Sequence, residues 1–303
     1  MSLTARQLEI RLGGVTATDV VALSGMSPHG RTAHDVYCEK LEIAAPWVAS
    51  DEAEIGEVIE PVVIRRLAKT LGLHVLRRKA DEMTIVHPEH PTRVATPDAF
   101  FATTAFTPLL ATGQVKVVGA HKFYEWGPDG EEPPDWVSVQ CTWEGHVARV
   151  PVVHVGALLG TEVRAYTVAV AGDLLEALIE VADRFWTDHV LAQRPPPIDG
   201  SAGSGRMLKS LFPRARLGPS IPATPEAEEA ARAYFAFRAQ AKAADAELEG
   251  AKQALIAACG DAPGITGNGW RLLRGMRKGY TVTPEPYTVP EGRGFDLRAM
   301  GKR

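Results

Sequence analysis

Hydrophobic and polar positions in the first 200 residues follow two different periods along the chain. Alternating or continuous apolar runs predict strands at 74–76, 83–87, 98–101, 113–118, 150–159 and 161–170. Apolar positions three and four apart predict helices at 16–25, from 50 to 72 with a kink at Pro61, and onward from a cap at Asp173. Residues 136–143 fit either a helix or a strand. This mixture of elements predicts an α/β core.

The composition changes near residue 200, where prolines and small polar residues replace the periodic pattern. Three prolines stand at 195–197, and the run Ser201–Gly205 follows them. Such stretches are typical of connections between domains. The sequence therefore predicts a first domain over 1–200 and a linker over 201–223.

The remaining residues, 224–303, form the predicted C-terminal extension. Pro at the first helical position and Gly at the stop predict one long helix from Thr224 to Gly260, and short alternating runs within 269–287 predict a small β-hairpin. Apolar residues spaced four and three apart form a seam on the helix: Ala230, Tyr234, Phe237, Ala241, Ala244, Leu248, Ala251 and Leu255. A neighbouring helix of the same chain is the simpler partner for this seam, and a partner protein is the alternative.

Composition narrows the class of protein. The 303 residues are 45% hydrophobic and 23% charged, as in an ordinary globular protein. No stretch approaches 18 apolar residues, and the start lacks a signal-peptide core, so we expect a cytoplasmic protein that does not associate with membranes. The three cysteines are far apart and form no CxxC pair, which argues against a zinc site or a disulfide framework.

The net charge of −4 gives the chain no overall attraction to nucleic acid. Binding to DNA would therefore depend on local basic patches. The candidate patches are Arg65, Arg66 and Lys69, then Arg77, Arg78 and Lys79, and finally Arg206, Lys209, Arg214 and Arg216. Each of them is equally compatible with a solvated surface.

Candidate chemistry lies on two of the predicted strands. Asp98 begins one, and Gln114-Val115-Lys116 lies on another, where period-two alternation points residues 114 and 116 the same way and turns Val115 toward the core. A Mg²⁺ ion could bind between Asp98, residue 114 and the Val115 carbonyl, with Lys116 facing an attacking water. Glu60 and its neighbour Glu57 lie one turn apart on the helix, so at least one of them could face the same cleft.

A second candidate site lies near the start of the chain. Thr16 and Asp19 have capping-box spacing, which predicts the start of a short helix. The free N–H groups of that first turn, the Thr18 hydroxyl and the Arg11 guanidinium could together bind a phosphate. The alternative is an ordinary capped helix with Arg11 in a surface ion pair.

Taken in order, these segments resemble the YqaJ-type viral recombinase family, relatives of phage lambda exonuclease within the PD-(D/E)XK nucleases. Arg11–Val20 is similar to the opening motif R-L-G-x-[IV]-T-A-S-[DE]-V, and Gly56–Pro61 to G-x-x-x-E, which selects Glu60. Thr96–Asp98 matches S-P-D, Gln114–Lys116 stands where E-x-K belongs, and Gln140–Trp143 lies at the Q-x-Q-[WY] helix. The resemblance covers roughly residues 7 to 200.

The resemblance implies a restriction-endonuclease-like core, in which helices flank a mixed central β-sheet, followed by a helical and β-hairpin extension. It implies a Mg²⁺-dependent 5′ to 3′ exonuclease, with Mn²⁺ as a substitute, that acts on linear double-stranded DNA. The 3′ single-stranded tails would serve a single-strand annealing protein, and some relatives form trimeric rings. A bacterial cell, with phage or prophage origin, is the implied setting.

The family roles carry over by position. Asp98, Gln114, the Val115 backbone carbonyl and Glu60 would hold the metal, and Lys116 would orient or stabilise the nucleophile. Gln140 would support the nucleophile or the phosphate. A further group of three residues would bind a terminal 5′-phosphate: Arg11, Thr16 and Thr18.

Gln114 is the departure from the family pattern, because an amide oxygen can contact a metal but brings no negative charge. Gln is isosteric with Glu, which fits a natural variant or an engineered substitution, and this form would be slowed or inactive. Two other functions stay open. One is a non-catalytic DNA-end-binding recombination module, and the other is a nicking or site-specific endonuclease on the same fold.

Overall fold

The computed structural model describes residues 3–44, 51–128, 131–170, 172–213 and 220–273. The chain divides into two compact units, Met1–Pro213 and Arg214–Arg303, and each is described by itself. Among the described residues, no helix combines the length and the apolar character that spanning a bilayer requires.

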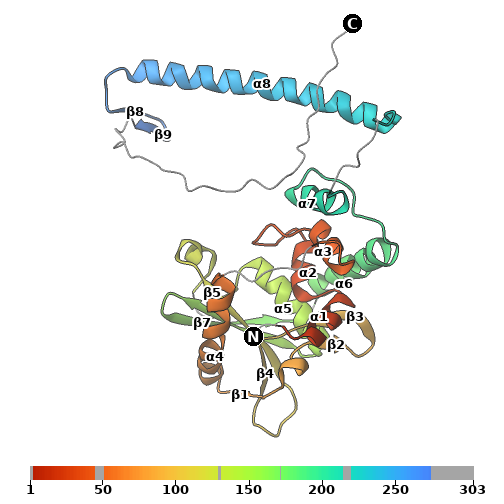
Figure 1. Cartoon of the computed structure of the whole chain (residues 1–303). Helices are drawn as coiled ribbons and strands as arrows, with labels where there is room; N and C mark the ends of the chain where they lie inside the picture. Colours follow the sequence, from red (N-terminus) through yellow and green to blue (C-terminus); the bar gives the residue numbers. More distant parts are fainter. Residues whose placement is uncertain (1–2, 45–50, 129–130, 171, 214–219, 274–303) are drawn as a thin grey trace, which may run out of the picture. The chain divides into compact units, whose positions relative to one another are not determined.

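A five-stranded sheet forms the centre of the first unit (Figure 1). Its order is β1 (His74–Val75), β4 (Ala99–Ala102), β5 (Ala111–Val118), β6 (Val152–Leu159) and β7 (Glu162–Ala169). The β5–β6 pair is parallel and the other pairs are antiparallel. The predicted mixed central sheet is therefore confirmed.

A separate two-stranded sheet pairs β2 (Ile85–His87) with β3 (His90–Ala95). Sequence pattern did not predict β3, because its first half carries a proline and polar side chains. β3 also holds the start of the chain in place, since Val15 exchanges backbone hydrogen bonds with Thr92 and Val94 at 2.7 and 3.0 Å.

Helices cover the sheets and connect their strands. The α-helices of this unit are α1 (Ala5–Leu12), α2 (Ala17–Leu23), α3 (Ala33–Lys40), α4 (Asp51–Leu71), α5 (Asp135–Ala148), α6 (Asp173–Phe185) and α7 (Ala202–Leu211). Three shorter turns are η1 (Ala80–Glu82), η2 (Ala120–Glu125) and the π-helical η3 (Trp186–Leu191). The predicted capping box of α2 is present, and α4 continues as one helix through Pro61.

Helices α4 and α5 cover opposite faces of the central sheet. Gly156 of β6 faces α4, because a Cβ atom there would lie 2.8 Å from Val63. Val153, three residues earlier in β6, points to the other face, because a Cβ atom on Gly145 of α5 would lie 3.0 Å from its side chain. Gln114 pairs with Val155 in the register of β5 and β6, so it shares the face that α5 covers.

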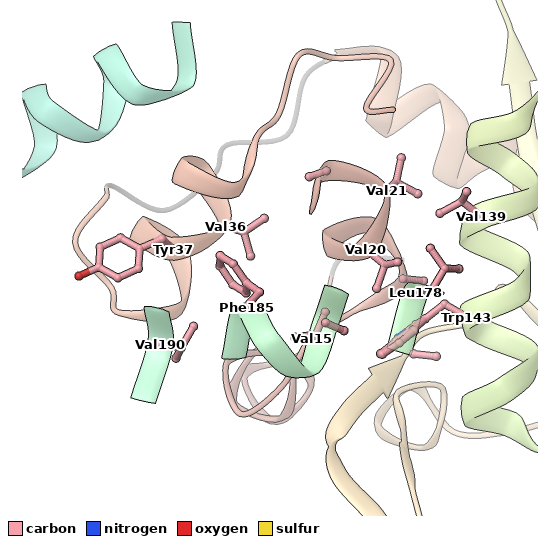
Figure 2. Packing of buried hydrophobic residues seen from close by; sticks show 14 of the residues in the cluster. Val15, Val20, Val21, Val36, Tyr37, Val139, Trp143, Leu178, Phe185 and Val190 are labelled. Atoms are coloured by element: carbon pink, nitrogen blue, oxygen red, sulfur yellow. The ribbon is translucent and has the colours of Figure 1, made fainter. Parts of the chain in front are cut away.

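Helix α5 is buried on nearly every side. Val139 and Trp143 pack into a cluster with residues of α2, α3 and α6, among them Val20 and Phe185 (Figure 2). Its opposite side packs Val137 against the central sheet. A helix that is apolar around its circumference has no amphipathic period, which is why residues 136–143 fitted a strand as well.

Two predicted boundaries of this unit are wrong. The Ser-Gly run assigned to the linker over 201–223 forms helix α7, which packs on α3 and buries Met207, so the unit extends to Pro213. Ser201 caps that helix by accepting from the Ser204 N–H at 3.1 Å. Asp173 is the first helical residue of α6 rather than its cap, and the cap is Gly172.

The second unit contains the predicted long helix, α8 (Pro225–Cys259), and a hairpin of β8 (Gly264–Gly267) and β9 (Trp270–Leu273). The hairpin begins earlier than predicted, and the rest of the predicted segment, 274–287, lies outside the described residues. Phe237 and Leu248 of the apolar seam are exposed.

Candidate active site

Asp98 lies directly before β4 and is held against β5. Its Oδ2 accepts the Val115 backbone N–H at 2.7 Å, and its own N–H donates to the Gly113 carbonyl at 3.0 Å. The two segments predicted to form the site therefore meet. Asp98 contacts the N–H of Val115, and the use of the Val115 carbonyl as a metal ligand stays a prediction.

Three polar side chains form a closed hydrogen-bonded triangle at β5 and α5. Lys116 Nζ donates to Gln114 Oε1 at 3.2 Å and to Gln140 Oε1 at 2.9 Å, and Gln140 Nε2 donates to Gln114 Oε1 at 3.0 Å. Because the Lys116 ammonium can only donate, it sets the orientation of both amides. The same ammonium lies 5.3 Å from the centre of the Trp136 ring.

The burial of β5 differs from the prediction. Val115 was expected to face the core, but it is only half-buried, whereas Gln114 is 2% exposed. Both faces of the sheet are covered, and α5 covers the Gln114 face more completely. Gln114 therefore lies inside the protein, with its amide oxygen already accepting two hydrogen bonds.

Glu144 is a site residue that the sequence reasoning missed. It lies one helical turn after Gln140, is 1% exposed, and its Oε1 accepts from Gln140 Nε2 at 3.0 Å. Its Oε2 is buried with no hydrogen-bond partner in the described part of the chain. Burial, together with repulsion from Asp98, raises the pKa of Glu144 to about 8. A signal was present, namely a Glu four residues after Gln140 on a largely apolar helix.

Glu60 of α4 lies close enough to Asp98 for their charges to interact. Burial, then repulsion from Asp98 and Glu57, raises the pKa of Glu60 to about 7. The pKa of Asp98 is also raised by burial, although Lys116 and the Val115 N–H oppose that shift. The structure thus brings Glu60 together with Asp98, as the family motif implied.

The residues at this site fit a divalent cation in their chemistry. Burial raises the pKa of Asp98, Glu60 and Glu144, and repulsion from Asp98 adds to the shift of the other two; buried carboxyl groups of this kind are usually paired or bound to a metal. Within the described ranges, no three His, Cys, Asp or Glu side chains converge on one point as a preformed metal site.

Of the residues predicted to bind a 5′-phosphate, Arg11 contacts the segment that carries Asp98. Arg11 Nη1 donates to the Thr96 hydroxyl at 3.1 Å, two residues before Asp98, and among the described residues Arg11 forms no ion pair. Thr16 is buried and its hydroxyl caps α2. Thr18 is exposed, with its hydroxyl 3.2 Å from that of Thr16.

A buried ion cluster fixes the segment that carries Arg11. Lys40 Nζ donates to the Arg11 carbonyl at 2.7 Å and lies 2.7 Å from Asp19 Oδ2. Asp19 also lies 2.7 Å from Arg31, and it accepts the Thr16 N–H at 2.8 Å as part of the capping box. Asp19, the acidic residue of the opening motif, thus has a structural role.

The basic patches divide into different kinds. Arg206 forms a bidentate pair with Asp35, at 2.7 and 2.6 Å, and therefore helps to hold α7 on α3. Arg65, Arg66 and Lys69 are exposed on α4. Arg214 and Arg216 lie outside the described residues.

Comparison with known proteins finds a matching family model and a curated relative. Residues 7–150 match the model of the YqaJ-like viral recombinase domain. The chain is 23% identical over 245 residues to the uncharacterized protein YqaJ of Bacillus subtilis (strain 168), which covers 76% of this chain and 70% of that protein.

Solved structures with a similar fold include an alkaline exonuclease, LHK-Exo, from Laribacter hongkongensis. It is 15% identical with a TM-score of 0.48, over 63% of this chain and 94% of that one. A structure of LHK-Exo in complex with dAMP gives a TM-score of 0.49 at the same identity and coverage. The family model and the Bacillus subtilis relative confirm the resemblance predicted from the motifs: residues 7–150 of this chain are similar to the YqaJ-like viral recombinase domain.

Proposed function

We propose that this chain is a metal-dependent nuclease that degrades linear double-stranded DNA from 5′ to 3′ and leaves 3′ single-stranded tails. The observation that carries the proposal is the convergence of Asp98 with the Lys116, Gln114 and Gln140 triangle between β5 and α5. The match to a viral recombinase domain supports DNA as the substrate.

Asp98 and Glu60 would hold a divalent cation, either Mg²⁺ or Mn²⁺, with Gln114 beside it. Bound there, such a cation lowers the pKa of a water molecule and stabilises charge on a phosphate. Lys116 supplies a fixed positive charge toward the same place, where it would stabilise the developing hydroxide and the phosphate oxygens. Gln140 holds the Lys116 ammonium at 2.9 Å and so positions it.

Arg11 and Thr18 would bind the terminal 5′-phosphate. Arg11 is anchored on both sides, because its guanidinium donates to Thr96 and its carbonyl accepts from Lys40. The Arg11 guanidinium therefore contacts Thr96, which lies two residues before Asp98 in the chain. The single-strand annealing protein and the trimeric ring are part of the same proposal and rest on the family resemblance alone.

A DNA-end-binding module without catalysis is the second candidate function. Gln114 favours it, because the neutral amide adds no charge for a metal and its oxygen already accepts two hydrogen bonds. The protein would then bind DNA ends without cleaving them.

Digestion of 5′-phosphorylated linear duplex DNA with Mg²⁺ tests these functions. We expect the native chain to release nucleotides, and Asp98→Ala or Lys116→Ala to slow release by about 100-fold or more, since each removes a group acting on the reacting phosphate. Glu180→Gln, which removes an exposed ion pair with Arg184, is the control and should digest normally. Tight binding of ends without digestion would support the binding module instead. If closed circular duplex DNA is cut as readily as linear duplex DNA, the proposal of an exonuclease is wrong, because circular DNA has no end.

A further inference from the structure

We propose that Glu144 supplies the metal-binding carboxylate that residue 114 lacks. The inference deepens the proposed nuclease function and depends on it. In this chain the negative charge expected on β5 comes instead from α5, which packs across the same face of the sheet.

The contacts place Glu144 beside Gln114. One amide nitrogen, Gln140 Nε2, donates to Gln114 Oε1 at 3.0 Å and to Glu144 Oε1 at 3.0 Å. The two acceptor oxygens therefore lie no more than about 6 Å apart. A carboxylate on α5 thus reaches the neighbourhood that a carboxylate at position 114 would occupy.

The burial of Glu144 leaves one of its carboxylate oxygens unsatisfied. A carboxylate that is 1% exposed needs hydrogen-bond donors on both oxygens, yet Oε2 has none among the described residues. The nearby ammonium of Lys116 donates to Gln114 and Gln140 and makes no ion pair with Glu144 in the described structure. A buried carboxylate with an unsatisfied oxygen, close to Gln114 and to other carboxyl groups, is suited to binding a cation.

A charge exchange between the two positions tests the inference in the full-length chain. The variants are Glu144→Gln, Gln114→Glu and the double variant, and the probe is Mn²⁺ alone, followed by electron paramagnetic resonance titration without DNA. We expect Glu144→Gln to weaken Mn²⁺ binding by about 10- to 100-fold. The double variant moves the carboxylate back to β5 and should recover most of the native affinity. Asp135→Asn, at an exposed position of α5, is the matched control and should bind as the native chain does.

Each outcome separates the inference from the proposed function. Unchanged Mn²⁺ binding by Glu144→Gln, with the native chain still digesting DNA, would overturn the role of Glu144 and leave the nuclease intact. No Mn²⁺ binding and no digestion by either the native chain or Gln114→Glu would overturn both. If Glu144→Gln fails to fold, Glu144→Asp replaces it. Asp keeps the carboxylate charge on a side chain that is shorter by one methylene group. Weaker Mn²⁺ binding by that variant supports the proposal, and native binding by it contradicts the proposal.

Discussion

Asp19→Asn should destabilise the first unit severely, although Asn has nearly the same shape as Asp. The Asp19 and Lys40 side chains are both 0% exposed, and their charged atoms lie 2.7 Å apart. The substitution leaves the Lys40 ammonium buried with only the Arg11 carbonyl and a distant Glu39 oxygen at 4.0 Å. Leaving one partner of a buried ion pair uncompensated costs about 3–5 kcal/mol. For a unit of this size that loss lowers the melting temperature by about 10 °C.

Urea unfolding at several pH values measures this effect. The Lys40 and Arg31 charges hold the pKa of Asp19 well below its ordinary value against the opposing effect of burial. The stability that Asp19 contributes is therefore complete above an unfolded pKa of about 4 and is lost as the pH falls through the lower folded pKa. The gap between native and variant should be constant from pH 7 to 5 and should shrink below pH 4. A gap under about 1 kcal/mol at pH 7, or one that widens in acid, would refute the reasoning.

Three further predictions concern the site and the sheet. Glu60→Gln should stabilise the metal-free chain at pH 8 but not at pH 4 in urea titrations. Burial and then repulsion from Asp98 raise the Glu60 pKa to about 7, so the native chain loses stability as the pH rises through that value. Equal effects of the substitution at both pH values would contradict this. Gly156→Ala should lower the free energy of unfolding by about 1–3 kcal/mol, since the new Cβ would lie 2.8 Å from Val63, and a neutral effect would show that α4 moves freely. Arg11→Ala should slow digestion of 5′-phosphorylated ends more than of 5′-hydroxyl ends, and equal slowing would remove Arg11 from phosphate binding.

Local pattern was sufficient for most of the elements and for the candidate site residues other than Glu144. Alternating or continuous apolar runs predicted β4 to β7, the Thr16 and Asp19 spacing predicted the cap of α2, and Pro225 with Gly260 predicted the ends of α8. These features depend on residues within a few positions of one another, so the sequence contains the whole signal. The resemblance of the ordered motifs to the YqaJ family indicated the candidate site residues.

The wrong domain boundary near residue 200 arose where packing overrides local preference. The Ser-Gly run at 201–205 reads as a linker, but it becomes helical because the helix it joins buries Met207 against α3. Small residues allow this close approach, since a Cβ on Gly203 would collide with Thr32. Composition alone does not distinguish a flexible connection from a tightly packed helix.

The sequence by itself determined which residues could form the site, namely Asp98, Gln114, Lys116 and Gln140, because each lies in a local motif. Only the tertiary structure decided that Gln114 is buried beneath α5 and that Glu144 lies beside it. The physical reason is that α5 is buried around its circumference and therefore shows no period that would orient it. Which of its side chains faces β5 depends on packing between residues far apart in the chain, and that packing places the Glu144 carboxylate close to Gln114.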